Sequence, residues 1–362
     1  MYGCEDAPAG GPEDRKGGRH VVARAERKQG AGGRDGEDGR GGEARGVVLV
    51  GADGSDSALH AVETAAREAR ARGARLSVIH AFIWPLLKVP LGPSPYGPPD
   101  GGLRQQAQGI VDGAVAHARA CAPGIEVTGE VLAGEPLTIL AARSASAELV
   151  VVGSRGTGAF SGLVLGSVAV HLAAHAACPV LVVRGSGKPG GPVVLAVDGS
   201  RDSEAAVDFA FAAAAARGAE LRAVHAWTPS SGPADLTPLF HGTEEIRGEE
   251  ERVLAAALAG ATARWPQVSV ERRLVRGRPR PVLLEESAGA QLLVMGARGR
   301  GGFAGLLLGS VSQALLHHAE CPVAVVRGDA GGAGGARGAD DARDAAETGV
   351  ALAPGGFDER RG

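Results

Sequence analysis

Two glycine-rich segments share one spacing of small residues, and this spacing could form a site for a phosphate group. The first segment reads GSRGTGAFSGLVLGSV from Gly153, and the second reads GARGRGGFAGLLLGSV from Gly296. In each, two residues separate the first two glycines, and nine residues then lead to a Gly-Ser pair. With 58 glycines in the chain a lone match would carry little weight, but the whole pattern recurs 143 residues later.

The chemistry of this spacing is that of a main-chain anion site. Glycine permits positive φ and lets a ligand approach main-chain N–H groups closely. The pattern ends where a helix is expected to begin, and the first N–H groups of a helix are unpaired and lie at its positive end. Ser167 and Ser310 could cap these helices or donate a hydroxyl hydrogen bond to a phosphate. We therefore expect two phosphate cradles.

An aspartate follows the first predicted strand of each repeat. Asp53 lies in GADGSDS and Asp198 in AVDGSRDS, 145 residues apart. A carboxylate there could bind ribose hydroxyls or hold a Mg²⁺ ion near phosphates. The alternative is a local role as a helix cap or an Asx-turn, which Asp-Gly-Ser also favours. We favour the ligand-binding interpretation, because this loop and the glycine pattern flank the same predicted switch point.

The elements that must position these residues alternate between strand and helix. In the first repeat, apolar runs predict strands at 47–52, 74–82, 125–132, 148–153 and 179–183. Helices are predicted from a cap at 55–57 to a stop at Gly73, and at 103–121, 136–147 and 167–177. The second repeat follows the same order over 192–327. Continuous apolar strands between helices predict a doubly wound parallel sheet, which binds ligands where the strand order reverses.

Matching segments define two domains. ARGARLSVIHAF at 71–82 matches ARGAELRAVHAW at 216–227, and CPVLVVRG at 178–185 matches CPVAVVRG at 321–328. We expect domains at 46–185 and 192–328, joined by a flexible linker at 186–191. The ends, 1–45 and 329–362, are rich in Gly and charged residues and are expected to be disordered. The Pro-rich run at 85–99 is expected to be a surface loop near the site.

Bulk composition excludes several classes of protein. The formal net charge is −3, which is not the basic footprint of a nucleic-acid-binding protein. The 4 scattered cysteines do not resemble a disulfide framework, and no apolar run approaches the ~20 residues of a membrane span. A soluble cytoplasmic protein is expected. Aromatic residues make up only 3%, so the cores must be built from Ala, Val and Leu.

At these residues the chain resembles the universal stress protein family. Its diagnostic motif, G-x2-G-x9-G-[ST], is intact in both repeats, and the early aspartates and the closing CPVLVV and CPVAVV also match. The resemblance implies a five-stranded parallel sheet of order 3-2-1-4-5 in each domain, with ATP at the switch point. The residues it places around the ligand are Ala52, Asp53, Ala81, Gly153, Arg155, Gly156, Gly166, Ser167 and Val168 in the first domain, and Ala196, Val197, Asp198, Ala226, Gly296, Arg298, Gly299, Gly309, Ser310 and Val311 in the second.

Further consequences of the resemblance concern partners and chemistry. It implies pairing through the last strands, Val180–Val183 and Val323–Val326, which a tandem chain could satisfy within one molecule; a homo-oligomer is the other possibility. We expect an ATP-binding stress-response module that is not an enzyme, with ADP or cyclic AMP left open as ligands. Two alternatives remain: a slow ATPase or adenylate-forming enzyme that uses the aspartates, and a structural tandem whose glycines only make turns.

Three other groups of residues have side chains that could form sites. His175 with Cys178 and His318 with Cys321 could ligate a metal, but each pair is two short of a structural zinc site, and a helix-end His beside a buried Cys is preferred. His80 and His225 end the second strands without an evident partner, so packed histidines are expected. Arg155 and Arg298 could contact phosphate or ribose or remain solvated.

Overall fold

The computed structural model describes residues 46–82, 102–156, 165–228, 243–300 and 307–328. The terminal segments, the Pro-rich run and the middle of each glycine pattern lie outside these ranges. The first domain contains β1 (Val47–Gly51), α1 (Asp56–Arg72), β2 (Arg75–Phe82), α2 (Leu103–Cys121), β3 (Val127–Ala133), α3 (Pro136–Ser144), β4 (Leu149–Gly153), α4 (Ser167–His175) and β5 (Val180–Val183).

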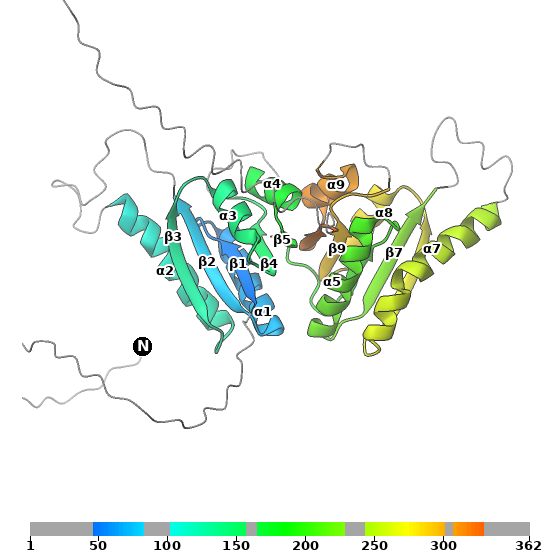
Figure 1. The fold of residues 1–362 in the computed structure, drawn as a ribbon, viewed down its shortest axis with the longest axis horizontal. Helices are drawn as coiled ribbons and strands as arrows, with labels where there is room; N and C mark the ends of the chain where they lie inside the picture. The colour runs from blue at the N-terminus through cyan, green and yellow to red at the C-terminus, as the bar shows by residue number, and fades with distance from the viewer. Residues whose placement is uncertain (1–45, 83–101, 157–164, 229–242, 301–306, 329–362) are drawn as a thin grey trace, which may run out of the picture. The chain divides into compact units, whose positions relative to one another are not determined.

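The second domain repeats this order (Figure 1). It contains β6 (Val193–Ala196), α5 (Arg201–Arg217), β7 (Leu221–Trp227), α7 (Thr243–Arg264), β8 (Val270–Arg276), α8 (Pro279–Ser287), β9 (Leu292–Gly296), α9 (Ser310–His318) and β10 (Val323–Val326).

The strands follow the predicted order in both domains. The first domain is ordered β3-β2-β1-β4-β5 and the second β8-β7-β6-β9-β10, which is 3-2-1-4-5 in each case. All pairs within a domain are parallel. The last strands, β5 and β10, pair antiparallel with Val182 opposite Val323, so the ten strands form one sheet. The expected α/β fold is confirmed.

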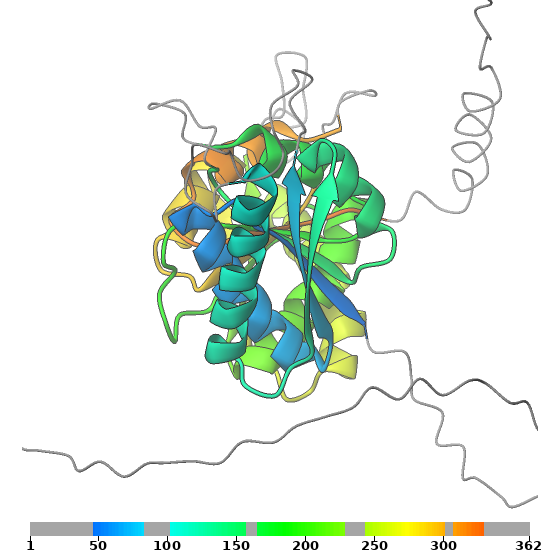
Figure 2. The ribbon, with the colours of Figure 1, turned by 90° about the vertical axis from the view of Figure 1, so that its left-hand side faces the viewer.

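Helices cover both faces of each half of the sheet, as the two views show (Figure 1, Figure 2). One face packs against α1, α2, α5 and α7, and the other against α3, α4, α8 and α9. As expected from the composition, the buried side chains are mostly Ala, Val and Leu, and Phe211 is the largest fully buried one among the described residues. Small side chains let the helices approach the sheet closely.

Caps fix where the first helix of each domain begins and ends. Ser55 caps α1 by accepting a hydrogen bond from the Ala58 N–H, and Gly73 ends it with φ 65°. Ser200 caps α5 in the same way, and Gly218 ends it with φ 58°. Each cap lies two residues after the aspartate that follows strand one, so the cap fixes the chain at the edge of the sheet where the candidate site lies.

Two predicted helix ends were too long. α3 stops at Ser144 rather than at 147, and α4 stops at His175 rather than at 177. The reason is a buried hydroxyl: Ser144 Oγ donates to the Ala141 carbonyl at 2.6 Å and accepts from the Ala177 N–H at 2.9 Å. This serine satisfies main-chain groups at the ends of both helices and joins them. In the second domain Ser287 does the same. In the described part of the chain no helix is long and apolar enough to cross a membrane.

Candidate functional site

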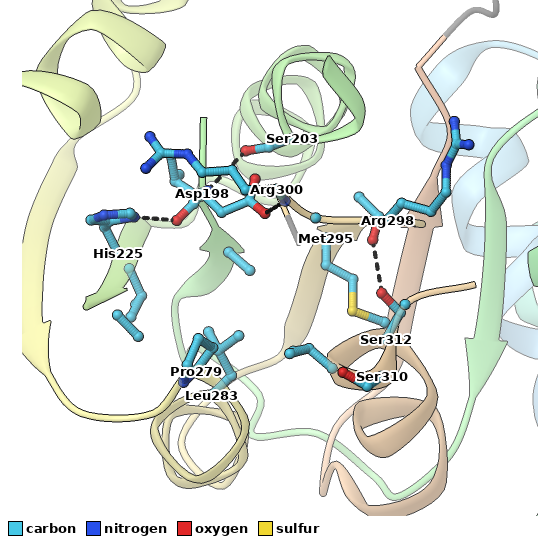
Figure 3. A pocket seen from close by; sticks show the side chains of 18 of the residues that line it. Asp198, Ser203, His225, Pro279, Leu283, Met295, Arg298, Arg300, Ser310 and Ser312 are labelled. Atoms are coloured by element: carbon cyan, nitrogen blue, oxygen red, sulfur yellow. Dashed lines mark hydrogen bonds between the residues drawn. The ribbon is translucent and has the colours of Figure 1, made fainter. Parts of the chain in front are cut away.

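A cavity of about 580 Å³ opens at the carboxyl ends of the strands of the second domain (Figure 3). It lies where the strand order reverses, between β6 and β9. Figure 3 shows Pro279 and Leu283 of α8 on one side, and Ser310 and Ser312 of α9 on another. The remaining walls come from the ends of β6, β7 and β9, from the glycine segment and from Glu250 of α7.

Every residue that the sequence predicted for the second site lines this cavity. The set consists of Ala196, Val197, Asp198, Ala226, Gly296, Arg298, Gly299, Gly309, Ser310 and Val311. Their counterparts occupy the same places in the first domain: Asp53 follows β1, Gly153 ends β4, and Gly166 and Ser167 begin α4. The structure thus brings the predicted residues of the second site together, while their role in binding a ligand stays a prediction.

The first two glycines of each pattern serve close packing rather than positive φ, which corrects the expectation. None of the described glycines of either pattern has positive φ. Instead, a Cβ at position 296 would lie 2.7 Å from the main-chain carbon of Asp202, at the start of α5. A Cβ at position 299 would lie 2.4 Å from Asp198 Oδ2. Positive φ occurs in the aspartate turns, at Gly54 (84°) and Gly199 (73°).

The serines of the Gly-Ser pairs do not cap their helices. The N-caps of α4 and α9 are Gly166 and Gly309, and neither has a side-chain cap hydrogen bond. Each of these glycines donates its N–H to the carbonyl of the residue that follows the preceding strand. Gly166 donates to Ser154 at 2.8 Å, and Gly309 donates to Ala297 at 2.9 Å. Ser310 therefore stands at the first helical position, where its main-chain N–H, like that of Val311, has no partner within the helix. The helix start therefore keeps unpaired N–H groups without the predicted cap, and their role in binding an anion stays a prediction.

The aspartates form Asx-turns, as the alternative interpretation held. Asp53 Oδ1 accepts from the N–H of Ser55 at 3.0 Å and from its hydroxyl at 2.6 Å. Asp198 Oδ1 accepts from the Ser200 N–H at 2.9 Å, and its Oδ2 accepts from the Arg300 N–H at 3.0 Å. The Asp198 carboxylate therefore joins the turn that follows β6 to the glycine segment that follows β9. It remains at the cavity wall, so the turn does not remove it from the site.

Sequence reasoning missed a buried carboxylate beneath the glycine segment. Asp202 is 5% exposed; its Oδ2 accepts from the N–H and Nε of Arg298 at 3.0 and 3.3 Å, and its Oδ1 accepts from the Gly328 N–H at 3.0 Å. The first domain has Ser57 at the matching position, and Ser57 Oγ accepts from the Arg155 N–H at 3.3 Å. The only signal in the sequence was the Asp-for-Ser difference between the repeats.

Both strand-two histidines are packed against the end of strand one, as expected. His80 Nδ1 is 2.7 Å from the Ala52 carbonyl oxygen, and His225 Nδ1 is 2.6 Å from that of Val197. A carbonyl only accepts, so each Nδ1 carries the proton. The unexpected partner is Glu250 of α7, whose Oε2 lies 2.7 Å from His225 Nε2. No sequence motif pointed to Glu250, because the residues between β7 and α7 (228–242) contain no motif that relates the position of the helix to that of His225.

The helix-end cysteines are poorly suited to ligate a metal. Burial raises the pKa of the Cys178 thiol to about 11 and that of Cys321 to about 12. Metals bind the thiolate, which these surroundings disfavour. Across the described ranges no three His, Cys, Asp or Glu side chains are grouped so that they could hold a metal ion.

The fold and the candidate site define a tandem of doubly wound domains with a cavity at a switch point, and comparison with known proteins gives the family. The model of the universal stress protein family matches the chain twice, over residues 45–184 and 191–327. Universal stress protein Mb2019 of Mycobacterium bovis is 38% identical over 301 residues, covering 77% of this chain and 94% of that protein. Universal stress protein Rv2005c of Mycobacterium tuberculosis is 39% identical over 295 residues, covering 77% and 96%. The chain belongs to the universal stress protein family.

Solved structures agree on the fold. A universal stress protein from Archaeoglobus fulgidus superimposes with a TM-score of 0.55 at 22% identity, covering 78% of this chain and 97% of that one. The protein PA1789 from Pseudomonas aeruginosa, described as functionally unknown, gives a TM-score of 0.52 at 18% identity, covering 79% and 94%. At these identities the likeness is one of architecture.

The close packing of the glycines makes a graded prediction for stability. Gly296→Ala forces apart main-chain atoms of β9 and α5, so we expect it to lower the free energy of unfolding by ~3 kcal/mol. Gly299→Ala displaces only the Asp198 carboxylate and its hydrogen bond, at a cost of ~1 kcal/mol. Gly260→Ala meets nothing within 4 Å in the interior of α7 and should stabilise by ~0.5–1 kcal/mol. Urea unfolding measures all three, and a loss at 296 no larger than at 299 would contradict the packing account.

Proposed function

We propose that each domain binds an adenine nucleotide, ATP, at its switch point, and that the chain acts as a nucleotide-binding stress-response module. The observation that carries the proposal is the convergence of the ten predicted residues on one cavity of the second domain. Its volume, about 580 Å³, lies within the range of small-molecule sites. The main chain of Val197 and Ala226 would frame adenine, and Asp198 would meet ribose or a Mg²⁺ ion.

The start of α9 supports the phosphate end of this proposal. Ser310 and Val311 line the cavity and present main-chain N–H groups of the first turn, next to the N-cap Gly309. In the first domain Gly166 and Ser167 begin α4 in the same way. The cradle therefore fits a phosphate by its chemistry, which combines main-chain donors with the positive end of a helix.

Binding without catalysis fits the hydrogen bonds of the second site better than hydrolysis does. Both oxygens of Asp198 accept main-chain N–H groups, and both ring nitrogens of His225 face acceptors, the Val197 carbonyl and Glu250. A general base needs an accessible lone pair within reach of the attacking water. We infer that these groups hold the loops and the ligand. If the alternative, a slow ATPase, were correct, Asp198→Asn would abolish a measurable release of phosphate.

We further propose that the two domains pair within one chain. The support is the antiparallel ladder between β5 and β10 and an ion pair between Glu68 of α1 and Arg217 of α5. Glu68 is 5% exposed and also accepts from Arg72, so its charge is compensated from both domains. Such pairing covers the β5 and β10 edges, which would otherwise be open to strand addition.

A single substitution separates ligand binding from folding. Gly309 has φ −72°, and a Cβ there would meet its nearest neighbour only at 3.5 Å, so a side chain fits without strain. Aspartate is also a favourable N-cap, so Gly309→Asp should leave α9 intact while repelling a phosphate. We expect calorimetry to show two ATP sites in the wild type. In Gly309→Asp the affinity of the second site for ATP should be at least ~10-fold weaker, which corresponds to ~1.4 kcal/mol of binding free energy.

The matched control for this variant is Gly309→Asn, which has nearly the same shape and no charge. It should retain most of the ATP affinity, and Gly166→Asp should affect the first site alone. Wild-type protein that binds no ATP at tens of micromolar would contradict the proposal. Unchanged affinity in both aspartate variants would favour the structural tandem instead.

Pairing within one chain predicts a monomer. Sedimentation equilibrium at micromolar concentration should give the mass of a single chain, because β5 and β10 are already paired with each other. A mass of two chains that persists on dilution would contradict intramolecular pairing and would favour a homo-oligomer built through these strands.

A further inference from the structure

Three charged or ionisable side chains form a connected series at the cavity of the second domain. His225 Nε2 and Arg300 Nη1 both approach the same oxygen, Glu250 Oε2, at 2.7 and 3.6 Å. The Arg300 main chain is held separately, because its N–H donates to Asp198 Oδ2 at 3.0 Å. All four residues line the cavity that contains Gly309. The series therefore links α7, β7 and the turn after β6 to the glycine segment.

The Arg300 side chain lies along the wall of the cavity rather than pointing away from it. A Cβ at position 199 would be 2.6 Å from Arg300 Nη2, so the guanidinium rests against the turn that follows Asp198. Figure 3 shows the side chains of Arg298 and Arg300 extending in opposite directions, with Arg300 on the side of His225. Arg298 is engaged by Asp202, and among the described residues that line the cavity Arg300 is the other arginine.

The contact that holds the Arg300 guanidinium is weak by its geometry. Within the described residues it is a single ion pair at 3.6 Å, and the side chain is 47% exposed, whereas Glu250 is 23% exposed and also bound to His225. Long, exposed ion pairs contribute little, while a phosphate accepts two parallel hydrogen bonds from one guanidinium. A phosphate group at the start of α9 would therefore compete successfully for Arg300, and Glu250 would keep its histidine.

The sequence of the first domain has no charged residue at either of the two positions that correspond to Glu250 and Arg300. Across the helices that follow strand two, the repeats align with an offset of 143, as Pro123 and Pro266 show, and Ala107 then stands where the second domain has Glu250. The residue after the second glycine of the pattern is Thr157 in the first repeat and Arg300 in the second. His80 keeps the contact with the end of strand one, so this histidine is common to both domains. The charges of Glu250 and Arg300 belong to the second domain.

We propose that Arg300 binds the phosphate chain of a nucleotide in the second site. Glu250 holds the Arg300 guanidinium in the empty site, and the phosphates replace Glu250 as its partner when the nucleotide binds. This inference rests on the proposed function and deepens it. The second site selects nucleoside polyphosphates over nucleosides, and the first site, with neutral residues at both positions, discriminates less. The two sites of the chain then differ in what they report: the second responds to the degree of phosphorylation.

Trp227 provides a reporter for the second site alone. It lines the cavity and is 7% exposed, and its counterpart in the first domain is Phe82. Replacing the other two tryptophans, Trp84→Phe and Trp265→Phe, leaves one indole whose fluorescence changes when the second cavity is filled. Titrations of the full chain with adenosine and with ATP then give the selectivity of this site as a ratio of dissociation constants.

The expected result is a change in ATP affinity that adenosine does not share. Arg300→Gln should weaken ATP about 10-fold and leave adenosine within about 2-fold, because one charge-assisted contact to phosphate is lost. Glu250→Gln retains an acceptor for His225 but releases Arg300, so ATP should bind about 3-fold more tightly. In the Arg300→Gln background, Glu250→Gln should have a smaller effect, since the two act through each other.

Matched controls lie next to Glu250 on α7. Glu251→Gln removes a negative charge, as Glu250→Gln does, and Arg252→Gln removes a positive charge, as Arg300→Gln does. Neither Glu251 nor Arg252 lines the cavity, so both control variants should leave the ratio of the two dissociation constants unchanged. Equal losses for ATP and adenosine in Arg300→Gln would overturn the inference, as would a gain from Glu250→Gln of the same size with and without Arg300. Protein that binds neither ligand overturns the proposed function itself, whereas ATP binding that ignores Arg300 overturns only this inference.

Discussion

The candidate site depends on a close contact between two main-chain segments that only glycine allows. Where β9 ends at Gly296, the start of α5 passes so near that a Cβ would lie 2.7 Å from the main chain of Asp202, and Gly153 makes the same contact with Ser57 in the first domain. Because of this contact, the turn after strand one packs directly against the loop after strand four. The Asp198 carboxylate can then accept the Arg300 N–H, and the cavity forms beside it.

Much of this arrangement could be predicted from the residues. Continuous Val-rich strands alternating with helices require a parallel sheet covered on both faces, and the family resemblance supplied the order 3-2-1-4-5, which the structure confirms. The predicted residues of the second site meet at one cavity because the carboxyl ends of parallel strands share an edge. The spacing of the glycines was therefore a reliable guide to position.

The physical role of the same glycines could not be predicted. Sequence spacing carries no information on whether a glycine is needed for its φ or for its missing Cβ, and Gly156 and Gly299 turn out to face the carboxylates of Asp53 and Asp198. Likewise, a helix cap was one of the two roles expected for Ser310, but the N-cap of α9 is Gly309, whose N–H donates to the Ala297 carbonyl. Glu250 and Asp202 were missed since their partners lie 25 and 96 residues away.

The two halves of the chain share their scaffold and differ in charge at the candidate site. Glu250 stands opposite Ala107 and Asp202 opposite Ser57, so the second domain carries buried or half-buried carboxylates where the first is neutral. The central claim is that the cavity holds a nucleotide with its phosphates at the start of α9. A crystal structure of the full chain grown with a non-hydrolysable ATP analogue tests it most directly. The account predicts triphosphate density within hydrogen-bond distance of the Ser310 and Val311 N–H groups. A second cavity left empty at saturating analogue, or density that does not contact these groups, would contradict the claim.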